Sequence, residues 1–296
     1  MGIKSYFTRN PHIVYIAPAI GVMVFLSIVP TLFLVLISFT NYQLGWQFSR
    51  AAFVGFANFV RLFTGADSDF WHSVRISLLF MFLATGIELV FGFFIASLLN
   101  NTEFKIKPLI TGVMIIPLAM TPSIAAQMWK LMLNAEYGII NHILQSLFSV
   151  KIIWLSPSLA FWSVLLVDIW MFTPFVTLII YAGLRSIPSE PYEAAAIDGA
   201  SRLQMLRFIT LPMMRKLLYL TVLLRSIDSL KLFDTPFVLT QGGPGNATVF
   251  LSLHVFRLAN AQNGLIGRAA GVALVLLAIV TIISSVLIKQ QRKGVD

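Results

Sequence analysis

Four charged residues recur at intervals of three in a moderately apolar stretch: Arg225, Asp228, Lys231 and Asp234. Residues three apart are neighbours on a helix, so the spacing predicts a polar stripe of alternating sign and no net charge. Each member has an opposite charge within reach, which lowers the cost of placing it among apolar groups. We expect Arg225 and Asp228 to pair and to line or gate a polar path. The alternative is that the outer half of this helix is simply solvated.

Two more acidic residues stand inside apolar segments. Asp168 is followed by Trp170, Pro174 and Phe175, and Pro174 removes a backbone donor and can open a helix locally. Aromatic faces and freed carbonyls together suit a sugar, whose CH groups stack on rings and whose hydroxyls need acceptors. The alternative is a proline kink with aromatic packing between helices. Glu88 is isolated, and we expect it to be hydrogen-bonded inside the protein rather than to contact a solute.

Several kinds of chemistry are missing from the sequence. There is no cysteine, and the four histidines show no metal-ligand spacing. No Gly-x-Ser-x-Gly nucleophile motif occurs, and no Gly-x-x-x-x-Gly-Lys-[Ser/Thr] phosphate loop. We therefore expect a non-enzymatic chain with no metal or cofactor of its own, in which any ATP-driven work needs a separate ATPase subunit.

The composition sets the environment in which these residues must be placed. Of 296 residues, 58% are hydrophobic and only 11% are charged, with a mean hydropathy of +0.86. Soluble domains carry about 25% charged residues. The composition excludes a cytosolic globular enzyme, a disordered chain and, despite a net charge of +9, a nucleic-acid binder. An all-α integral membrane protein remains.

Six segments are long and apolar enough to predict membrane spans. About 20 apolar residues cross a hydrocarbon core of roughly 30 Å. The predicted spans are 13–39, 76–99, 108–129, 159–182, 213–240 and 269–288, of which 213–240 is the least apolar.

The distribution of positive charge predicts the orientation. If the N-terminus is inside, the inner segments 1–12, 100–107, 183–216 and 289–296 hold twelve Lys and Arg residues. The outer segments 40–75, 134–158 and 241–265 hold five. Because basic loops stay on the cytoplasmic side, both ends are predicted to be cytoplasmic. The six-span domain is then 13–288, with an external loop at 40–75 and a long cytoplasmic loop at 183–216.

The long cytoplasmic loop has the pattern of two short helices. Ser189 and Pro191 suit a helix start, and Gly199 suits a stop because glycine tolerates a positive φ. Ser201 and Gln204 form a capping-box pattern that starts a second helix. Three alanines, 194–196, would present a small, smooth surface to another protein. The alternative is a solvated connector between two spans.

The spacing in this loop resembles the "EAA" loop of the permease subunits of ABC importers. The matching residues are Glu193, Ala194, Ala195, Gly199, Ile209, Leu211 and Pro212. A second motif, residues 240–244 with Thr248, resembles the Thr-x-Gly-Gly-Pro signature of maltose-type larger permeases. The resemblance covers nearly the whole chain and identifies a permease subunit of a carbohydrate-uptake ABC importer.

The resemblance implies a set of partners and a location. The coupling-helix loop between the fourth and fifth spans would dock into a cleft of an ATPase dimer, with Glu193 and Gly199 at the contact. ATP and Mg would be bound by that ATPase. A second permease subunit would complete the pore, and an external solute-binding protein would deliver a sugar or polyol. The location implied is the cytoplasmic (inner) membrane of a prokaryote.

The resemblance also implies positions along the substrate path. Carried onto this sequence, they are Met171, Phe172, Phe175, Arg225, Asp228, Ser229 and Leu232. The maltose-type subunit has Tyr where Phe175 stands, so a hydrogen bond is lost here. Its pocket is mainly neutral, whereas Arg225 and Asp228 are charged, so the identity of the solute stays open.

Two other classes of function compete with the importer. A stand-alone secondary transporter or channel is possible, but six spans without an evident internal repeat are few for a secondary transporter. An intramembrane enzyme is disfavoured because catalytic pairs are missing.

Overall fold

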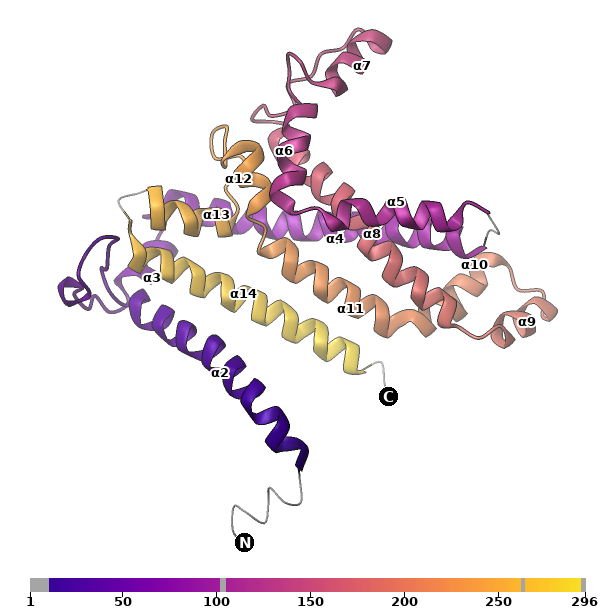
Figure 1. The fold of residues 1–296 in the computed structure, drawn as a ribbon, viewed down its shortest axis with the longest axis horizontal. Coiled ribbons are helices and arrows are strands. Elements are labelled where there is room, and N and C mark those ends of the chain that lie inside the picture. Colours follow the sequence, from indigo (N-terminus) through magenta and orange to yellow (C-terminus); the bar gives the residue numbers. More distant parts are fainter. Residues whose placement is uncertain (1–10, 102–104, 262–263, 294–296) are drawn as a thin grey trace. The chain divides into compact units, whose positions relative to one another are not determined.

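The computed structural model describes residues 11–101, 105–261 and 264–293, and these are built from helices with no β-strand (Figure 1). The α-helices are α2 (Pro11–Ser38), α3 (Ala57–Phe63), α4 (Ser68–Asn101), α5 (Lys107–Ala119), α6 (Pro122–Met132), α7 (Ile139–Phe148), α8 (Ala160–Ser186), α9 (Glu190–Ile197), α10 (Arg202–Met205), α11 (Leu211–Leu230), α12 (Asp234–Thr240), α13 (Leu251–Phe256) and α14 (Ile266–Lys293). Short 3₁₀ and π-helical turns occupy Phe48–Arg50, Leu206–Thr210 and Arg257–Ala261. Of the predicted terminal segments 1–12 and 289–296, residues 1–10 and 294–296 lie outside the described residues.

Four of the described helices are long and apolar enough to cross a membrane. They are Tyr15–Ser38, Ser68–Asn100, Ala160–Ser186 and Ile266–Arg292, within α2, α4, α8 and α14. They coincide with the predicted first, second, fourth and sixth spans, which confirms an all-α, multi-pass architecture. The total of six spans stays a prediction, because the remaining two segments are interrupted.

The predicted third span, 108–129, is not one straight helix. It divides into α5 and α6, whose axes are bent by 100°. Met120 and Thr121 between them are extended, with ψ of 147° and 146°. Pro122 accounts for the break because its ring disfavours the helical conformation of the preceding residue. Thr121 then caps α6 by accepting a hydrogen bond from the backbone N–H of Ile124 at 3.4 Å.

The predicted fifth span is also interrupted. α11 ends at Leu230 and α12 begins at Asp234, so the four-residue charged stripe is not continuous. Pro236 explains the break, because in an uninterrupted helix its ring would clash with the carbonyl of Leu232. With 20 residues, α11 is about 30 Å long at 1.5 Å per residue, but it is not among the four helices that are both long and apolar enough to cross a membrane.

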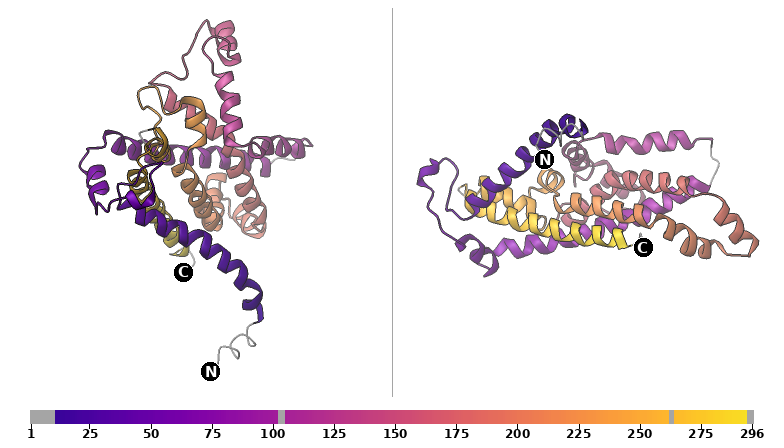
Figure 2. Two further views of the ribbon diagram at one scale, coloured as in Figure 1. Left: turned by 60° about the vertical axis from the view of Figure 1, so that its left-hand side comes forward. Right: turned by 90° about the horizontal axis from the view of Figure 1, so that it is seen from below.

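The chain divides into two compact units. The larger one comprises residues 67–254 and 276–296 and contains α4 to α12, the first four residues of α13 and the second part of α14. In it α4 and α8 pack side by side, and α11 packs on both (Figures 1 and 2). The close approach of α4 to α8 depends on Gly92, where a Cβ atom would lie 2.7 Å from Cγ1 of Val176. The other unit comprises residues 1–66 and 255–275. There the buried side chain of Asn58 donates to the carbonyls of Ser38 and Thr40, both at 2.8 Å.

Polar contacts tie the start of α4 to residues 246–254 within the larger unit. His254 Nε2 lies 3.0 Å from Asp67 Oδ2, and Asn246 Nδ2 donates to Asp69 Oδ1 at 3.0 Å. Burial raises the pKa of the Asp67 carboxyl, but the hydrogen bond and charge of His254 outweigh it, and the pKa lies below its usual value. The motif residues Thr240 and Thr248 are also joined, with 2.6 Å between their hydroxyl oxygens.

Candidate functional site

The centre of the larger unit holds a buried ionic cluster, the Arg225 triad, made of Arg225, Glu88 and Asp168. Arg225 comes from α11, Glu88 from α4 and Asp168 from α8, and none is more than 2% exposed. The guanidinium Nε and Nη2 both donate to the Glu88 carboxylate, the latter at 2.8 Å. Nη2 also donates to Asp168 Oδ2 at 2.8 Å. The triad therefore joins three helices through one side chain.

Further contacts fix the guanidinium. Its carbon lies 4.0 Å from the centroid of the Phe172 ring, and Nη2 lies 3.4 Å from Ser229 Oγ. A planar guanidinium can bind a carboxylate through two parallel hydrogen bonds and stack on an aromatic face at the same time. A buried charge needs such partners because leaving water is costly. The bidentate pair and the stacking explain why an arginine is found at this position.

The predicted Arg225–Asp228 ion pair is wrong. Arg225 forms its salt bridges with Glu88 and Asp168 instead. Asp228 pairs with Lys231, at 3.6 Å, and both side chains are about half exposed. The expectation that Glu88 is hydrogen-bonded inside the bundle is confirmed. The sequence interval of three predicted neighbours on one helix, but contacts between helices decided the partners of Arg225.

A cavity of about 350 Å³ lies beside the triad. It is lined by Pro122, Asp168, Phe172, Arg225, Asp228, Lys231, Leu232, Phe233, Asp234 and Thr235. The volume is in the range of small-molecule sites. α6 meets α12 at this point, where Ser123 Oγ donates to Asp234 Oδ1 at 3.0 Å. The two helix breaks described above thus bring charged and aromatic side chains to one cavity.

The predicted substrate-path residues divide into two groups. Phe172, Arg225, Asp228 and Leu232 line the cavity. The other three do not: Met171 and Ser229 are buried, and Phe175 packs against the apolar cluster around Ile180. The sequence did not predict that Phe233, Asp234 and Thr235 line the cavity together. The signal was Pro236, because it marks the break between α11 and α12 that brings these three residues to the cavity.

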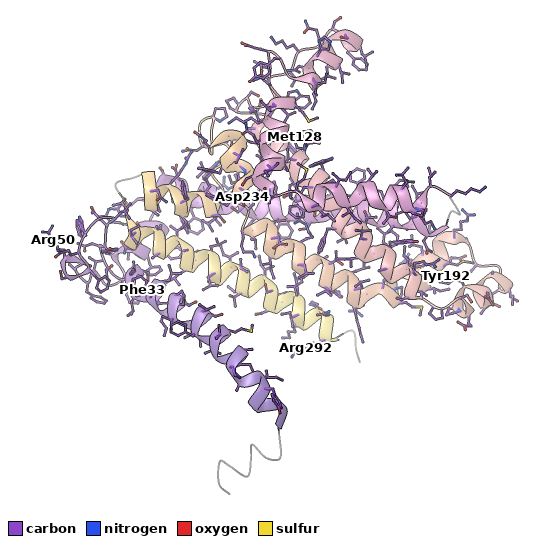
Figure 3. All side chains as sticks on the ribbon, in the orientation of Figure 1. Phe33, Arg50, Met128, Tyr192, Asp234 and Arg292 are labelled. Carbon is purple, nitrogen blue, oxygen red and sulfur yellow. The ribbon has the colours of Figure 1, made fainter. Side chains whose placement is uncertain are left out.

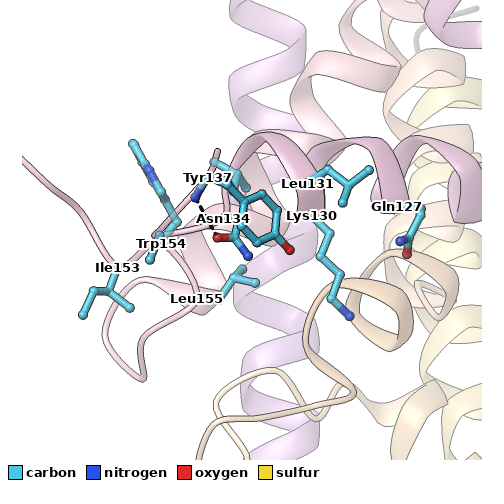
Figure 4. A pocket seen from close by; sticks show the side chains of 10 residues that line it. Gln127, Lys130, Leu131, Asn134, Tyr137, Ile153, Trp154 and Leu155 are labelled. Carbon is cyan, nitrogen blue, oxygen red and sulfur yellow. Dashed lines mark hydrogen bonds between the residues drawn. The ribbon is translucent and has the colours of Figure 1, made fainter. Parts of the chain in front are cut away.

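A second cavity, of about 220 Å³, lies between α6 and residues 153–155 (Figure 4). Several of its polar groups are engaged within the protein. Lys130 Nζ donates to the carbonyl of Val238 at 2.9 Å, and Asn134 Oδ1 accepts from the N–H groups of Glu136 and Tyr137. These contacts support the loops, so the cavity beside the triad is the candidate site.

The helix–turn–helix predicted for residues 189–205 is present in the structure, whereas the cytoplasmic location of this loop stays a prediction. α9 ends at Ile197, and Gly199 has a φ of +75°, where other residues are strained. Ser201 and Gln204 form the predicted capping box. Ser189 precedes α9, but its side chain makes no capping hydrogen bond. A π-helical turn then leads directly into α11.

The surface of this loop carries apolar side chains that the rest of the chain does not cover. Ile197, Leu203 and Phe208 are 87%, 72% and 68% exposed. Of the seven residues assigned to ATPase coupling, all but Ala195 and Ile209, which are half-buried, are exposed. Exposed apolar groups of this kind are found at contacts with other proteins or with a membrane.

Comparison with known proteins decides the family. Residues 88–293, which include the triad, the cavity and the loop, match the family described as binding-protein-dependent transport system inner membrane component. The chain belongs to this family. It is therefore a multi-pass permease of the ABC-importer type, as the resemblance implied.

Individual relatives agree with this assignment. The chain is 38% identical to the trehalose/maltose transport system permease protein MalF of Thermococcus litoralis over 74% of each chain. It is 31% identical to the sulfoquinovosyl glycerol transport system permease protein SmoG of Agrobacterium fabrum, over 94% of this chain and 89% of the relative. In fold it resembles a bacterial alginate ABC transporter crystallised with an alginate-bound periplasmic protein, with a TM-score of 0.82, 20% identity and coverage of 98% and 97%.

Proposed function

We propose that this family member translocates a sugar or polyol across the cytoplasmic membrane of a prokaryote by alternating access, driven by a separate ATPase subunit. The observation that carries the proposal is the course of α11. This helix starts at the exposed loop and ends at the cavity beside the triad, with Tyr192 and Asp234 marking the two distant regions (Figure 3). A movement of the loop can thus reach the cavity through one helix.

The proposed assembly has three kinds of partner. A second permease subunit completes the pore, a dimer of ATPase subunits binds ATP and Mg, and an external solute-binding protein delivers the solute. The exposed apolar residues of the loop support docking of the ATPase. The alginate importer of similar fold, which contains a periplasmic protein, supports the external partner. The positive-charge bias of the sequence supports a cytoplasmic location for both termini of this chain.

The residues that line the cavity favour binding of an uncharged polyhydroxylated solute. Its lining contains three carboxylates and two cationic groups, and the Glu88 carboxylate lies behind Arg225. Phe172 and Phe233 supply aromatic faces, and Asp228 supplies an exposed acceptor for hydroxyl groups. An excess of carboxylates disfavours an anionic solute. The trehalose/maltose permease, whose named solutes are uncharged sugars, agrees with this class. The solute in the name of the other sugar-linked relative, sulfoquinovosyl glycerol, is polyhydroxylated but carries a sulfonate, so it agrees only with the hydroxyl-binding part of the proposal.

Replacing Asp228 with asparagine tests the role of the cavity. We expect solute uptake by the assembled importer to fall about tenfold, because a hydrogen bond to a charged acceptor is worth about 1.5–3 kcal/mol. ATPase association should stay unchanged, since Asp228 lies at the opposite end of α11 from the loop. Radiolabelled uptake and co-purification of the ATPase measure the two effects.

The exposed Glu136 offers a matched control. Glu136→Gln also removes one carboxylate charge, but from a loop away from the cavity, and uptake should be unaffected. Unchanged uptake by Asp228→Asn would remove Asp228 from the path.

The alternative is a stand-alone secondary transporter or channel. Reconstitution separates the two: uptake by this chain alone in liposomes without ATP supports the alternative. Uptake that requires the sister permease, the ATPase and ATP supports the importer.

A further inference from the structure

A hydrogen bond closes the cytoplasmic loop on itself. The hydroxyl oxygen of Tyr192, in the first turn of α9, lies 2.8 Å from Oγ1 of Thr210. Tyr192 is half-buried and Thr210 is 7% exposed, so the contact is partly shielded from water. Neither residue belongs to the EAA spacing that predicted the coupling surface.

Thr210 occupies the junction between the loop and the spanning helix. It is the last residue of the π-helical turn Leu206–Thr210, and α11 begins at the next residue. Its hydroxyl also lies 3.4 Å from the carbonyl of Met205, five residues back. π-helical turns are rare and are found mostly at functional sites. The side chain of Thr210 therefore stabilises an unusual turn at the base of α11 and binds α9 at the same time.

The covalent route from α9 to α11 is made of short, separate elements. It passes through the glycine turn at Gly199, the single-turn helix α10 and the π-helical turn. A force applied to α9 along that route can be absorbed by bending at several points. The Tyr192–Thr210 contact bypasses all of them, because it joins the start of α9 directly to the residue that precedes α11.

We propose that Tyr192 and Thr210 are positioning residues that lock α9 to α11, so that displacement of α9 by the ATPase moves α11 and the cavity at its other end. This rests on the proposed docking of the loop onto the ATPase. The two residues do not contact the solute or nucleotide in this scheme. They determine how much of the ATPase movement reaches the spanning helix.

Removal of either hydroxyl tests the lock. Tyr192→Phe and Thr210→Val preserve side-chain shape, and we expect both to retain ATPase association and ATP hydrolysis in the assembled importer. The number of solute molecules transported per ATP should fall about fivefold, the effect of losing one typical intramolecular hydrogen bond on a two-state equilibrium. Thr210→Ser keeps the hydroxyl and should restore normal coupling. Tyr219→Phe removes a tyrosine hydroxyl from α11 outside the loop and serves as the matched control.

The double variant separates a shared contact from two independent effects. If the residues act through one hydrogen bond, Tyr192→Phe with Thr210→Val should be no worse than either single change. Additive losses, or a transport-to-ATP ratio equal to that of the unaltered importer in both single variants, would overturn the lock.

A failure of the lock is distinguishable from a failure of docking. The variant Gly199→Leu tests docking, because docking is measured directly by whether the ATPase still associates with the permease. If Gly199→Leu loses the ATPase while both hydroxyl variants couple normally, docking stands and the lock is overturned. If Gly199→Leu retains the ATPase with normal transport and coupling, the docking assignment fails, and the lock fails with it.

Discussion

Replacing Arg225 with leucine is expected to destabilise the protein by about 3–5 kcal/mol, because Glu88 and Asp168 would be left as buried carboxylates without a counter-charge. Both carboxylates accept hydrogen bonds from the guanidinium, and neither is more than 2% exposed. The substitution also removes the contact that joins α4, α8 and α11. Thermal unfolding of the purified chain in detergent, followed by circular dichroism, measures the loss.

Lys231 provides the matched control, because it is also a cation paired with an aspartate near the end of α11. Its ion pair with Asp228 is long and about half exposed. Pairs of this kind contribute about 0–1 kcal/mol, so Lys231→Leu should hardly change the unfolding temperature. Equal effects of Arg225→Leu and Lys231→Leu would contradict a structural role for the Arg225 triad.

A combined substitution tests whether the cost arises from the stranded carboxylates. Replacing a whole buried ionic cluster with apolar residues is often neutral or stabilising. Arg225→Leu together with Glu88→Leu and Asp168→Leu should therefore recover much of the stability that Arg225→Leu alone loses. Uptake should stay low in the triple variant, because Arg225 and Asp168 line the cavity. The structural and transport effects of the triad can thus be separated.

The features that could be predicted from the sequence are local ones. Four spans were found because apolar runs of about 20 residues need no knowledge of their neighbours. The helix–turn–helix loop was found because Gly199 and the capping box of Ser201 and Gln204 act within a few residues. The proline breaks were only partly anticipated. The spacing of the four charges predicts one continuous helical stripe, whereas Pro236 breaks the helix between Leu230 and Asp234.

The partners of Arg225 could not be predicted by spacing. Glu88 stands 137 residues away in sequence, and Asp168 stands 57 away. The sequence indicates that Glu88 and Asp168 are costly charges in apolar segments. Which of them form ion pairs with Arg225 depends on the register of α4 against α8 and α11. That register depends on close packing, for example at Gly92 against Val176. Four of the seven residues that the family resemblance implied for the substrate path line the cavity, and their role in transport stays a prediction. The general position of a site depends on topology more than on individual contacts.

Gly199→Leu is expected to reduce ATPase association at least about tenfold and to uncouple ATP hydrolysis from transport. Gly199 has a φ of +75°, so a side chain there costs about 1–2 kcal/mol of backbone strain. No atom of the described chain lies within 4 Å of the Cβ position that a substitution would add. The new side chain would therefore project from the turn into the surface proposed to bind the ATPase, close to the exposed Ile197. Co-purification and the transport-to-ATP ratio measure the two effects.

Gly65 separates a blocked surface from strained backbone. It has a φ of +80° and equally open space around its Cβ position, but it lies in the predicted external loop. Gly65→Leu therefore carries the same backbone strain as Gly199→Leu without a side chain at the cytoplasmic surface. ATPase association should be normal in Gly65→Leu and lost in Gly199→Leu. If both variants lose the ATPase equally, general misfolding explains the effect, and the turn at Gly199 has no particular place in the contact with the ATPase.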